Sequence, residues 1–371
     1  MAKQKQKKHV FLGTLRDTVL VAVSVGLAVL LLLSAKLTLI SPEKHSIGIY
    51  PNYLLPFLYL LNTVSLGYWV WRLKGWMLFP LMTILLCMAE QKVWFPVHLG
   101  EEAAPLTTKE YKILTYNTMQ FSGLKPHSKD KPNKVLEYLR SSQADIICLQ
   151  ETVCNNNQKS NHLSKDAVQK ALSVYPFHRS LPDDNSNRMW VFSKYPILKC
   201  SRIQYKSRYN ASYYCDIQID GKVIRVINNH LESNKLTSKD KHLYKDIIDK
   251  PDKESISHVA TALNRKLSPA ASLRAMQADV VAGIIEKSPY PVIVCGDFND
   301  IPNSYTYRRI SKGLQDAWAS NATGFGITFH ESLYRFRIDY ILHSPSIKSR
   351  HPKVDRLGYS DHYPLWTYFQ L

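Results

Sequence analysis

The chain contains 371 residues, of which 45% are hydrophobic, and it carries a formal net charge of +18. This apolar content is enough for one large core or two ordinary ones, and it excludes disorder as the main state. The charge resides mostly after residue 105 and favours phosphate-bearing partners or an anionic membrane surface. A merely soluble basic surface fits equally well, because no dense Lys/Arg block occurs there.

Three apolar runs near the N-terminus predict membrane helices. Residues 19–34 form an almost unbroken series of Val, Leu and Ala, and residues 53–71 contain no charge. Each is long enough, or nearly so, to cross about 30 Å of hydrocarbon as a helix. The third run, 76–89, is shorter and meets Glu90 and Lys92, so it fits a short span, a re-entrant segment or an interfacial helix.

Basic residues beside these runs predict the orientation of the chain. Four lysines and Arg16 precede the first run, and Arg72 and Lys74 follow the second. The positive-inside rule places both flanks in the cytoplasm. If the third run also spans, everything after it faces outward. We therefore expect a multi-pass protein of the plasma (inner) membrane, with the lipid bilayer as a partner and the rest of the chain on the outer face.

The composition divides the chain into three parts. We expect a membrane anchor with two or three transmembrane helices over residues 1–99, because all the long apolar runs lie there. Small and charged residues then predict a linker over 100–109. The third part, residues 110–371, is expected to fold as one catalytic domain.

Within this domain, strand-like and helical patterns alternate. Apolar runs such as 111–116 and 292–295 are typical of buried strands, whereas 131–142 and 272–286 repeat their apolar residues at helical spacing. This alternation predicts an α/β layered domain. Residues 233–267 form a polar segment that is long for a loop, and it fits either a lid over the substrate or a surface insertion.

The six cysteines do not form a metal-binding pattern, because no CxxC pair is present. Cys148 and Cys295 lie inside apolar runs and are expected to be buried core thiols. Cys200 and Cys215 lie on neighbouring candidate strands. They would pair if the domain lies outside the cytoplasm, which the sequence alone does not decide.

Polar residues recur where the strand-like runs end. Asn117, Glu151, His230 and Asp297 each follow such a run, so their side chains are expected to line a common rim. The complete series is Asn117, Glu151, His230, Asp297, Asn299, Asp339, Asp361 and His362. Any one of these is more often a turn former or a structural residue. Eight of them in one domain favour a shared site.

An oxygen-rich site of this kind suits Mg²⁺, or alternatively Mn²⁺, better than zinc. Glu151 and Asp361 are expected to be ligands, with Asn117 assisting. A carboxylate away from the metal, here Asp297, can deprotonate water for in-line attack on phosphorus. The histidines would then neutralise charge on the phosphoryl oxygens.

The chain from about residue 110 to 371 resembles the endonuclease/exonuclease/phosphatase superfamily, in a membrane-anchored bacterial form. The superfamily includes pancreatic-type deoxyribonucleases, abasic-site endonucleases, inositol polyphosphate 5-phosphatases and bacterial sphingomyelinases. The resemblance rests on Gln150-Glu151, on Gly296-Asp297-Phe298-Asn299 and on Ser360-Asp361-His362, which occur in the family's order. It implies a four-layer sandwich of two mixed β-sheets flanked by helices, here preceded by an N-terminal transmembrane helical region.

The resemblance also implies roles for the site residues. On the phosphate side, Asp297 would activate the nucleophile and Asn299 would orient it or the phosphate. His230 and His362 would contact the scissile phosphate, with Asp339 orienting His362. Asn117, Glu151 and Asp361 would lie on the metal side.

These expectations describe a membrane-anchored, Mg²⁺-dependent phosphoesterase that cleaves phosphate ester or diphosphate bonds by attack of water. Its substrate is either a lipid phosphate, which would explain the anchor, or nucleic acid, which would explain the basic surface. The sequence supports these two substrates about equally. An alternative of another class is a catalytically silent membrane-bound binding module with the same fold.

Overall fold

The computed structural model describes the chain apart from residues 1, 99–108, 126, 129, 155–162, 182–188, 208, 235–252 and 332–333. Nearly all of the predicted linker lies outside the described residues. So does the first half of the predicted lid or insertion. The second half of that segment differs from the prediction, because helix α9 already begins at Lys253 and continues through Pro269 to Glu286.

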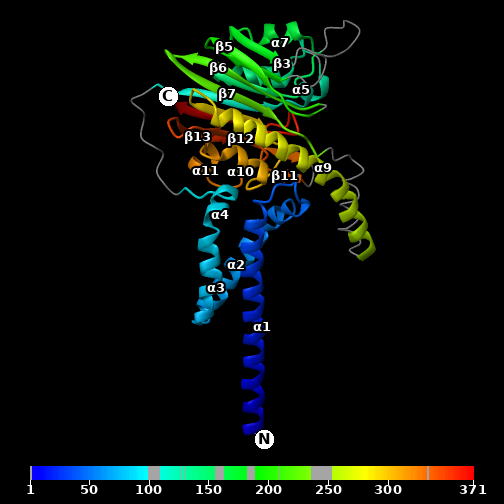
Figure 1. The fold of residues 1–371 in the computed structure, drawn as a ribbon, viewed down its shortest axis with the longest axis vertical. Helices are drawn as coiled ribbons and strands as arrows, with labels where there is room; N and C mark the ends of the chain where they lie inside the picture. The colour runs from blue at the N-terminus through cyan, green and yellow to red at the C-terminus, as the bar shows by residue number, and fades with distance from the viewer. Residues whose placement is uncertain are drawn as a thin grey trace.

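The N-terminal part forms a narrow helical anchor below the rest of the molecule (Figure 1). Its elements are α1 (Ala2–Leu37), η1 (Ser46–Gly48), α2 (Pro51–Trp71), η2 (Gly75–Met77), α3 (Leu78–Leu86) and α4 (Met88–Trp94). Two segments, Thr14–Leu37 and Ser46–Trp71, are long and apolar enough to cross a membrane. A third span results if the pair Gly75–Leu86 and Met88–Trp94, bent by 60°, is counted as one.

The remaining elements build two six-stranded sheets and their covering helices. One sheet has the order β13-β14-β1-β2-β4-β3, and the other has the order β5-β6-β7-β8-β12-β9. The strands are β1 (Tyr111–Asn117), β2 (Ile146–Gln150), β3 (Phe177–Leu181), β4 (Met189–Ser193), β5 (Ile197–Ile203), β6 (Ala211–Ile219), β7 (Lys222–His230), β8 (Val292–Asp297), β9 (Gln315–Asp316), β10 (Phe329–Glu331), β11 (Tyr334–Phe336), β12 (Asp339–His343), β13 (Lys348–Val354) and β14 (Leu365–Gln370). The helices are α5 (Met119–Leu124), α6 (Lys134–Ser141), α7 (Lys165–Ala171), α9 (Lys253–Glu286), α10 (Tyr305–Ser311) and α11 (Ala317–Asn321).

Three apolar clusters show how these layers are stacked. The central cluster joins side chains such as Ile113 of one sheet to Val226 of the other. A second cluster packs the outer face of the β1–β2 sheet on α6 and α7, and a third packs the outer face of the β7–β8 sheet on α9 and α10. Each sheet is mixed, because β1 and β2 are parallel, as are β7 and β8, among antiparallel neighbours. The predicted four-layer α/β sandwich is confirmed.

The cysteines agree with the sequence analysis. Cys148 and Cys295 are free and buried in the central cluster. Cys200 and Cys215 lie opposite each other on antiparallel β5 and β6 and form a disulfide. The Cys200–Cys215 pairing, which the sequence alone did not decide, is therefore present in the structure.

Specific polar contacts dock the anchor on the catalytic domain. Asn52 at the start of α2 donates to the carbonyl of Pro302 (2.8 Å), and Arg337 Nη2 donates to the carbonyl of Val93 in α4 (2.6 Å). Glu90 in α4 accepts a hydrogen bond from Arg308 at 3.1 Å. Asn52 and Arg337 are buried, where an unmade hydrogen bond would be costly. These contacts therefore fix the position of the anchor against the catalytic domain.

Candidate active site

Strand ends bring the predicted site residues to one edge of the sandwich. Asn117 pairs with Gln150 at the ends of parallel β1 and β2, so Glu151 follows at that edge. His230 pairs with Asp297 at the ends of parallel β7 and β8. Because the carboxyl ends of parallel strands point the same way, both sheets present their polar residues at a common rim. The expectation of a shared rim is met.

Gly296 lets β7 and β8 approach closely just before Asp297. Its φ is +117°, and a Cβ at this position would lie 2.7 Å from the backbone nitrogen of Asn229. Only glycine adopts this conformation without strain, and no other side chain fits the space.

Gly296→Ala is expected to lower the free energy of unfolding by roughly 2–4 kcal/mol, because backbone strain and overpacking add. Urea unfolding of the purified chain measures this. Gly283→Ala in α9 is the matched control, since nothing lies within 4 Å of a Cβ there. Equal stability of the two variants would contradict the close-approach argument.

His362 is held between two carboxylates. Its Nδ1 donates to Asp339 Oδ2 at 2.8 Å, and its Nε2 lies 3.8 Å from Asp297 Oδ2. Burial lowers the pKa of His362, but the charges of Asp339 and Asp297 outweigh burial and raise this pKa to about 10. The imidazole is therefore a cation at neutral pH, and its Nε2 proton points to the same carboxylate that is predicted to activate water.

Asp297 is the central acceptor of the site. It accepts hydrogen bonds from Asn117 Nδ2 at 3.0 Å and from the backbone nitrogen of Asn299 at 2.8 Å. Burial raises the pKa of Asp297 to about 6, with Asp339 adding to the rise, while His362 and His230 act in the opposite direction. The carboxylate is thus fixed in position and more basic than an exposed aspartate.

Glu151 and His230 complete the rim. Glu151 has φ +51°, which turns it out of the β2 direction, and its Oε1 lies 3.2 Å from Asn117 Nδ2 and 3.5 Å from His230 Nε2. His230 is buried, yet neither ring nitrogen has a hydrogen-bond partner among the described residues. The same is true of Asp339 Oδ1. Unsatisfied polar atoms gathered in one place are typical of a site that binds a polar ligand or ion.

Asp361 lies at the margin of this group. Ser360 Oγ is 2.8 Å from the carbonyl of Asn117 and 3.2 Å from Asp361 Oδ1, so it ties this segment to the end of β1. The Asp361 charge also contributes to the raised pKa of His362. Direct contacts therefore connect seven of the predicted residues, and Asp361 joins them through Ser360.

The oxygen donors of Glu151 and Asp361 fit a hard divalent cation, because such ions prefer carboxylate ligands. Asn117 presents its amide nitrogen to Glu151 and Asp297, and it therefore acts here as a hydrogen-bond donor. Among the described residues, the ligand atoms of Asp297, Asp339 and His362 also come within 4.8 Å of one another. Their arrangement suits a hydrogen-bonded acid–imidazole pair better than a metal site, since His362 Nδ1 already donates its proton to Asp339 Oδ2.

Two supporting residues were missed by the sequence analysis. Thr328 Oγ1 accepts hydrogen bonds from the backbone nitrogens of Ile338 and Asp339, both at 3.1 Å. The Phe329 ring lies 5.0 Å from the His362 ring. Both residues belong to the loop and hairpin that precede Asp339, where a Thr and a Phe carry no distinctive pattern. Only the fold reveals their position behind the acid–imidazole pair.

Two facing mixed sheets with carboxylates, amides and imidazoles at one edge define a hydrolase of phosphoester bonds. The chain belongs to the Endonuclease/Exonuclease/phosphatase family, whose model matches residues 114–362. Enzymes of this family act on phosphoester bonds and generally use divalent metal ions. Residues 17–93 match a second model, described as a domain of unknown function. No curated protein sequence matches the chain.

Several solved structures are similar in fold. The D. rerio TDP2 complexed with single-strand DNA product is 16% identical, covers 71% of this chain and 100% of its own, and gives a TM-score of 0.48. The human Nocturnin catalytic domain with bound sulfate is 17% identical over 70% and 94% of the two chains, with a TM-score of 0.47. An endonuclease/exonuclease/phosphatase from Beutenbergia cavernae is 15% identical over 71% and 72%, also with a TM-score of 0.47.

Proposed function

We propose that this protein is a membrane-anchored, Mg²⁺-dependent phosphoesterase that hydrolyses a phosphate-bearing lipid. The observation that carries the proposal is the β10–β11 hairpin, which connects the anchor to the site. Phe329 and Phe336 lie opposite each other in this hairpin. The Phe336 ring is 6.0 Å from the ring of Tyr53 in α2, and the Phe329 ring is 5.0 Å from the ring of His362. Because the site borders the anchor, a substrate held in the bilayer surface is favoured over nucleic acid.

The proposed reaction is in-line attack of water on phosphorus. Asp297 accepts the proton from water, and Asn299 keeps the carboxylate oriented through its two hydrogen bonds to it. Protonated His362, fixed by Asp339, donates a hydrogen bond to a phosphoryl oxygen as negative charge develops. His230, whose ring nitrogens are free of partners among the described residues, contacts the same phosphate.

The residues proposed to hold the metal are Glu151 and Asp361, with Asn117 assisting. Mg²⁺, or alternatively Mn²⁺, would supply Lewis-acid polarisation of the phosphoryl oxygen there. Asn117 links this metal side to Asp297, because its amide contacts both carboxylates.

We further propose that residues 1–99 form a three-span anchor, residues 100–109 a linker and residues 110–371 the catalytic domain, on the outer face. Arg72 Nη2 lies 3.1 Å from Asp17 Oδ2, which supports placing the basic flanks of α1 and α2 at one membrane surface. α3 and α4 then return toward the domain (Figure 1). The Cys200–Cys215 disulfide supports an oxidising compartment.

Thiol counting tests this orientation. If the domain faces outward, acid-quenched and denatured protein is expected to react with alkylating reagent at the four cysteines outside that disulfide, Cys87, Cys148, Cys154 and Cys295. Prior reduction should raise the count to the full six. Six reactive thiols without reduction would contradict the outer-face placement, and Cys200→Ser serves as a control that leaves Cys215 reactive.

The function is tested with the full chain in detergent, assayed on lipid phosphates and on DNA with Mg²⁺, with EDTA, and with the Asp297→Asn variant. Phosphate release from lipid that both EDTA and the variant abolish is the expected result. DNA cleavage with the same controls would make the protein a tethered nuclease. If the wild type turns over neither substrate faster than the Asp297→Asn variant does, the catalytically silent module is favoured.

A further inference from the structure

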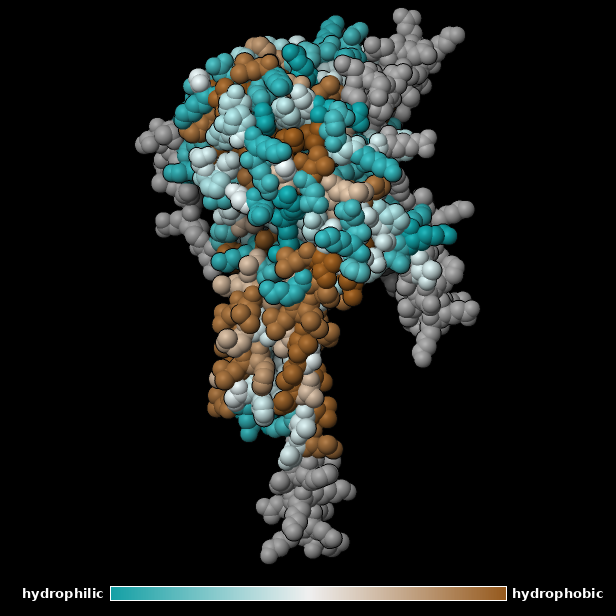
Figure 2. Space-filling view, viewed as in Figure 1, coloured by the Kyte–Doolittle hydropathy of each residue, from teal (hydrophilic) through white to brown (hydrophobic). Residues whose placement is uncertain are grey.

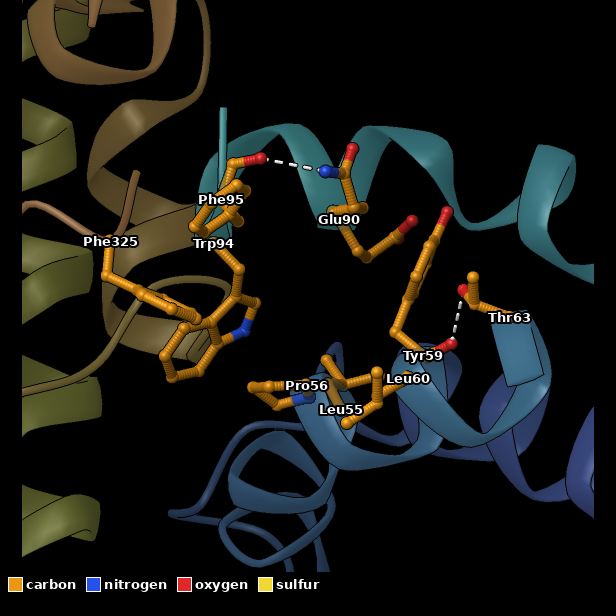
Figure 3. A pocket seen from close by; sticks show the side chains of 10 residues that line it. Leu55, Pro56, Tyr59, Leu60, Thr63, Glu90, Trp94, Phe95 and Phe325 are labelled. Carbon is orange, nitrogen blue, oxygen red and sulfur yellow. Dashed lines mark hydrogen bonds between the residues drawn. The ribbon is translucent and has the colours of Figure 1, made fainter. Parts of the chain in front are cut away.

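A second pocket lies where the anchor meets the catalytic domain, and none of the predicted catalytic residues lines it. It is a pocket of about 160 Å³, walled by Leu55, Pro56 and Leu60 of α2, by Trp94 of α4, and by Phe95 and Phe325 (Figure 3). Phe325 belongs to the catalytic domain, and its ring meets Phe95 edge-on with the centroids 4.8 Å apart. The pocket is therefore shared between the two parts of the chain.

The pocket runs along the first two-thirds of α2, beginning at the end nearer the domain. Leu55 and Thr63 lie about 6 Å and 18 Å along the helix from Pro51, at 1.5 Å rise per residue. Both fall inside the candidate span Ser46–Trp71. The apolar surface around the anchor continues up to the base of the domain (Figure 2). A ligand that enters from the side therefore comes from the hydrocarbon and ester region of one leaflet.

Trp94 gives the pocket one unsatisfied donor. Its indole Nε1 is buried and has no hydrogen-bond partner among the described residues. In Figure 3 the nitrogen-bearing edge of this ring points into the pocket. An N–H group in an apolar wall favours a ligand with an acceptor oxygen, because the unmade hydrogen bond is costly.

Glu90 restricts the charge of that ligand. It lines the pocket opposite the α2 residues, and its carboxylate pairs with Arg308 at 3.1 Å. Arg308 already pairs with this carboxylate, and no residue that lines the pocket is a cation, so a phosphate has no counter-charge there. A neutral ester oxygen is therefore the favoured acceptor. An apolar cavity of about 150 Å³ holds a molecule the size of benzene, so this pocket has room for a segment of about six carbons.

We propose that the pocket binds the ester-linked acyl chain of a membrane phospholipid, with the ester carbonyl accepting a hydrogen bond from Trp94 Nε1. The phosphate of that lipid stays outside the pocket. The first carbons of the chain contact both α2 and Phe325, so the bound lipid holds the anchor and the domain together. This site rests on membrane insertion of the anchor, and it is independent of hydrolysis at the active site.

The test uses the full chain, delipidated in detergent, and native mass spectrometry with two probes. One probe is a diacyl phosphatidylcholine, and the other is its dialkyl ether analogue, which lacks the carbonyl oxygens. The wild-type chain is expected to bind one diacyl molecule about threefold to tenfold more tightly than the ether, as one net hydrogen bond predicts. Trp94→Phe should bind both probes equally.

Leu60→Phe fills the mouth of the pocket and is expected to reduce binding of both probes at least tenfold. The matched control is Leu61→Phe, because Leu61 is the next residue of α2, is also exposed, and does not line the pocket. Wild-type binding by Leu60→Phe, or an ester preference that survives in Trp94→Phe, would overturn the proposal. These readouts do not depend on activity, so failure of the phosphoesterase assay leaves them unaffected.

Discussion

Asp297→Asn is expected to lower kcat by about 10²–10⁴-fold, the usual contribution of a general base. The substitution keeps the shape of the side chain and leaves an oxygen for the backbone N–H of Asn299, which now donates to Asp297 Oδ1 at 2.8 Å. It removes the ability to accept a proton. The measurement is steady-state hydrolysis, with saturating Mg²⁺, of whichever substrate the assays on lipid phosphates and DNA identify.

The stability of this variant separates a catalytic role from a structural one. The folded pKa of Asp297 is raised to about 6, so the folded chain binds this proton more tightly than the unfolded chain does. The stability that comes from this group is therefore lost as pH rises through about 6. Asparagine avoids that cost, but its amide group cannot accept from Asn117 Nδ2 and Asn299 Nδ2 at the position of Oδ2. These effects oppose each other, and with EDTA at pH 7.5 the variant should melt within a few degrees of wild type.

A matched control is Asp279→Asn on α9, since the side-chain contacts of Asp279 among the described residues are with Arg309 and Tyr305 and not with a predicted site residue. Its kcat should stay within a factor of two of wild type. If Asp297→Asn keeps wild-type turnover, Asp297 is not the base. If it instead melts well below wild type, the lost activity reports damage to the fold.

The position of the site could be predicted from sequence because strand ends set it. Asn117, His230 and Asp297 each end a short apolar run, and runs of that kind become buried strands whatever the loops do. Parallel pairing then brings these ends together. The four layers follow similarly, since each helix has one apolar face for an outer sheet surface.

Other features depend on contacts that no local pattern encodes. The early start of α9 is an exception, because Ile256, Val259 and Leu263 already recur at helical spacing although the segment is polar overall. The seat of the anchor depends on single side chains such as Asn52 and Arg337, which bond to backbone carbonyls far away in the chain. Thr328 supports Asp339 only because the hairpin folds back on β12.

The orientation of Asn117 also lies beyond sequence reasoning, and it bears on the metal. Its nitrogen faces Glu151 and Asp297, so in the structure the two carboxylates share one donor. Both negative charges remain close to the His230 ring, whose nitrogens have no hydrogen-bond partner in the described part of the chain. The proposed divalent cation beside Glu151 would balance that excess of negative charge, so we expect the charge of Glu151 to matter most for metal affinity.

Glu151→Gln is therefore expected to raise the dissociation constant for Mn²⁺ by at least about 10–100-fold, the range found for residues that merely support metal ligands. Glutamine retains a carbonyl oxygen that can accept from Asn117 Nδ2, so the change removes the charge and preserves the hydrogen bond. Isothermal titration with Mn²⁺ measures the affinity, and the Mg²⁺ dependence of kcat should shift to higher concentration in parallel. Glu137→Gln is the matched control, because Glu137 is an exposed residue of α6. Unchanged Mn²⁺ affinity in Glu151→Gln would remove Glu151 from the ligand set and point instead to the carboxylates beside His362.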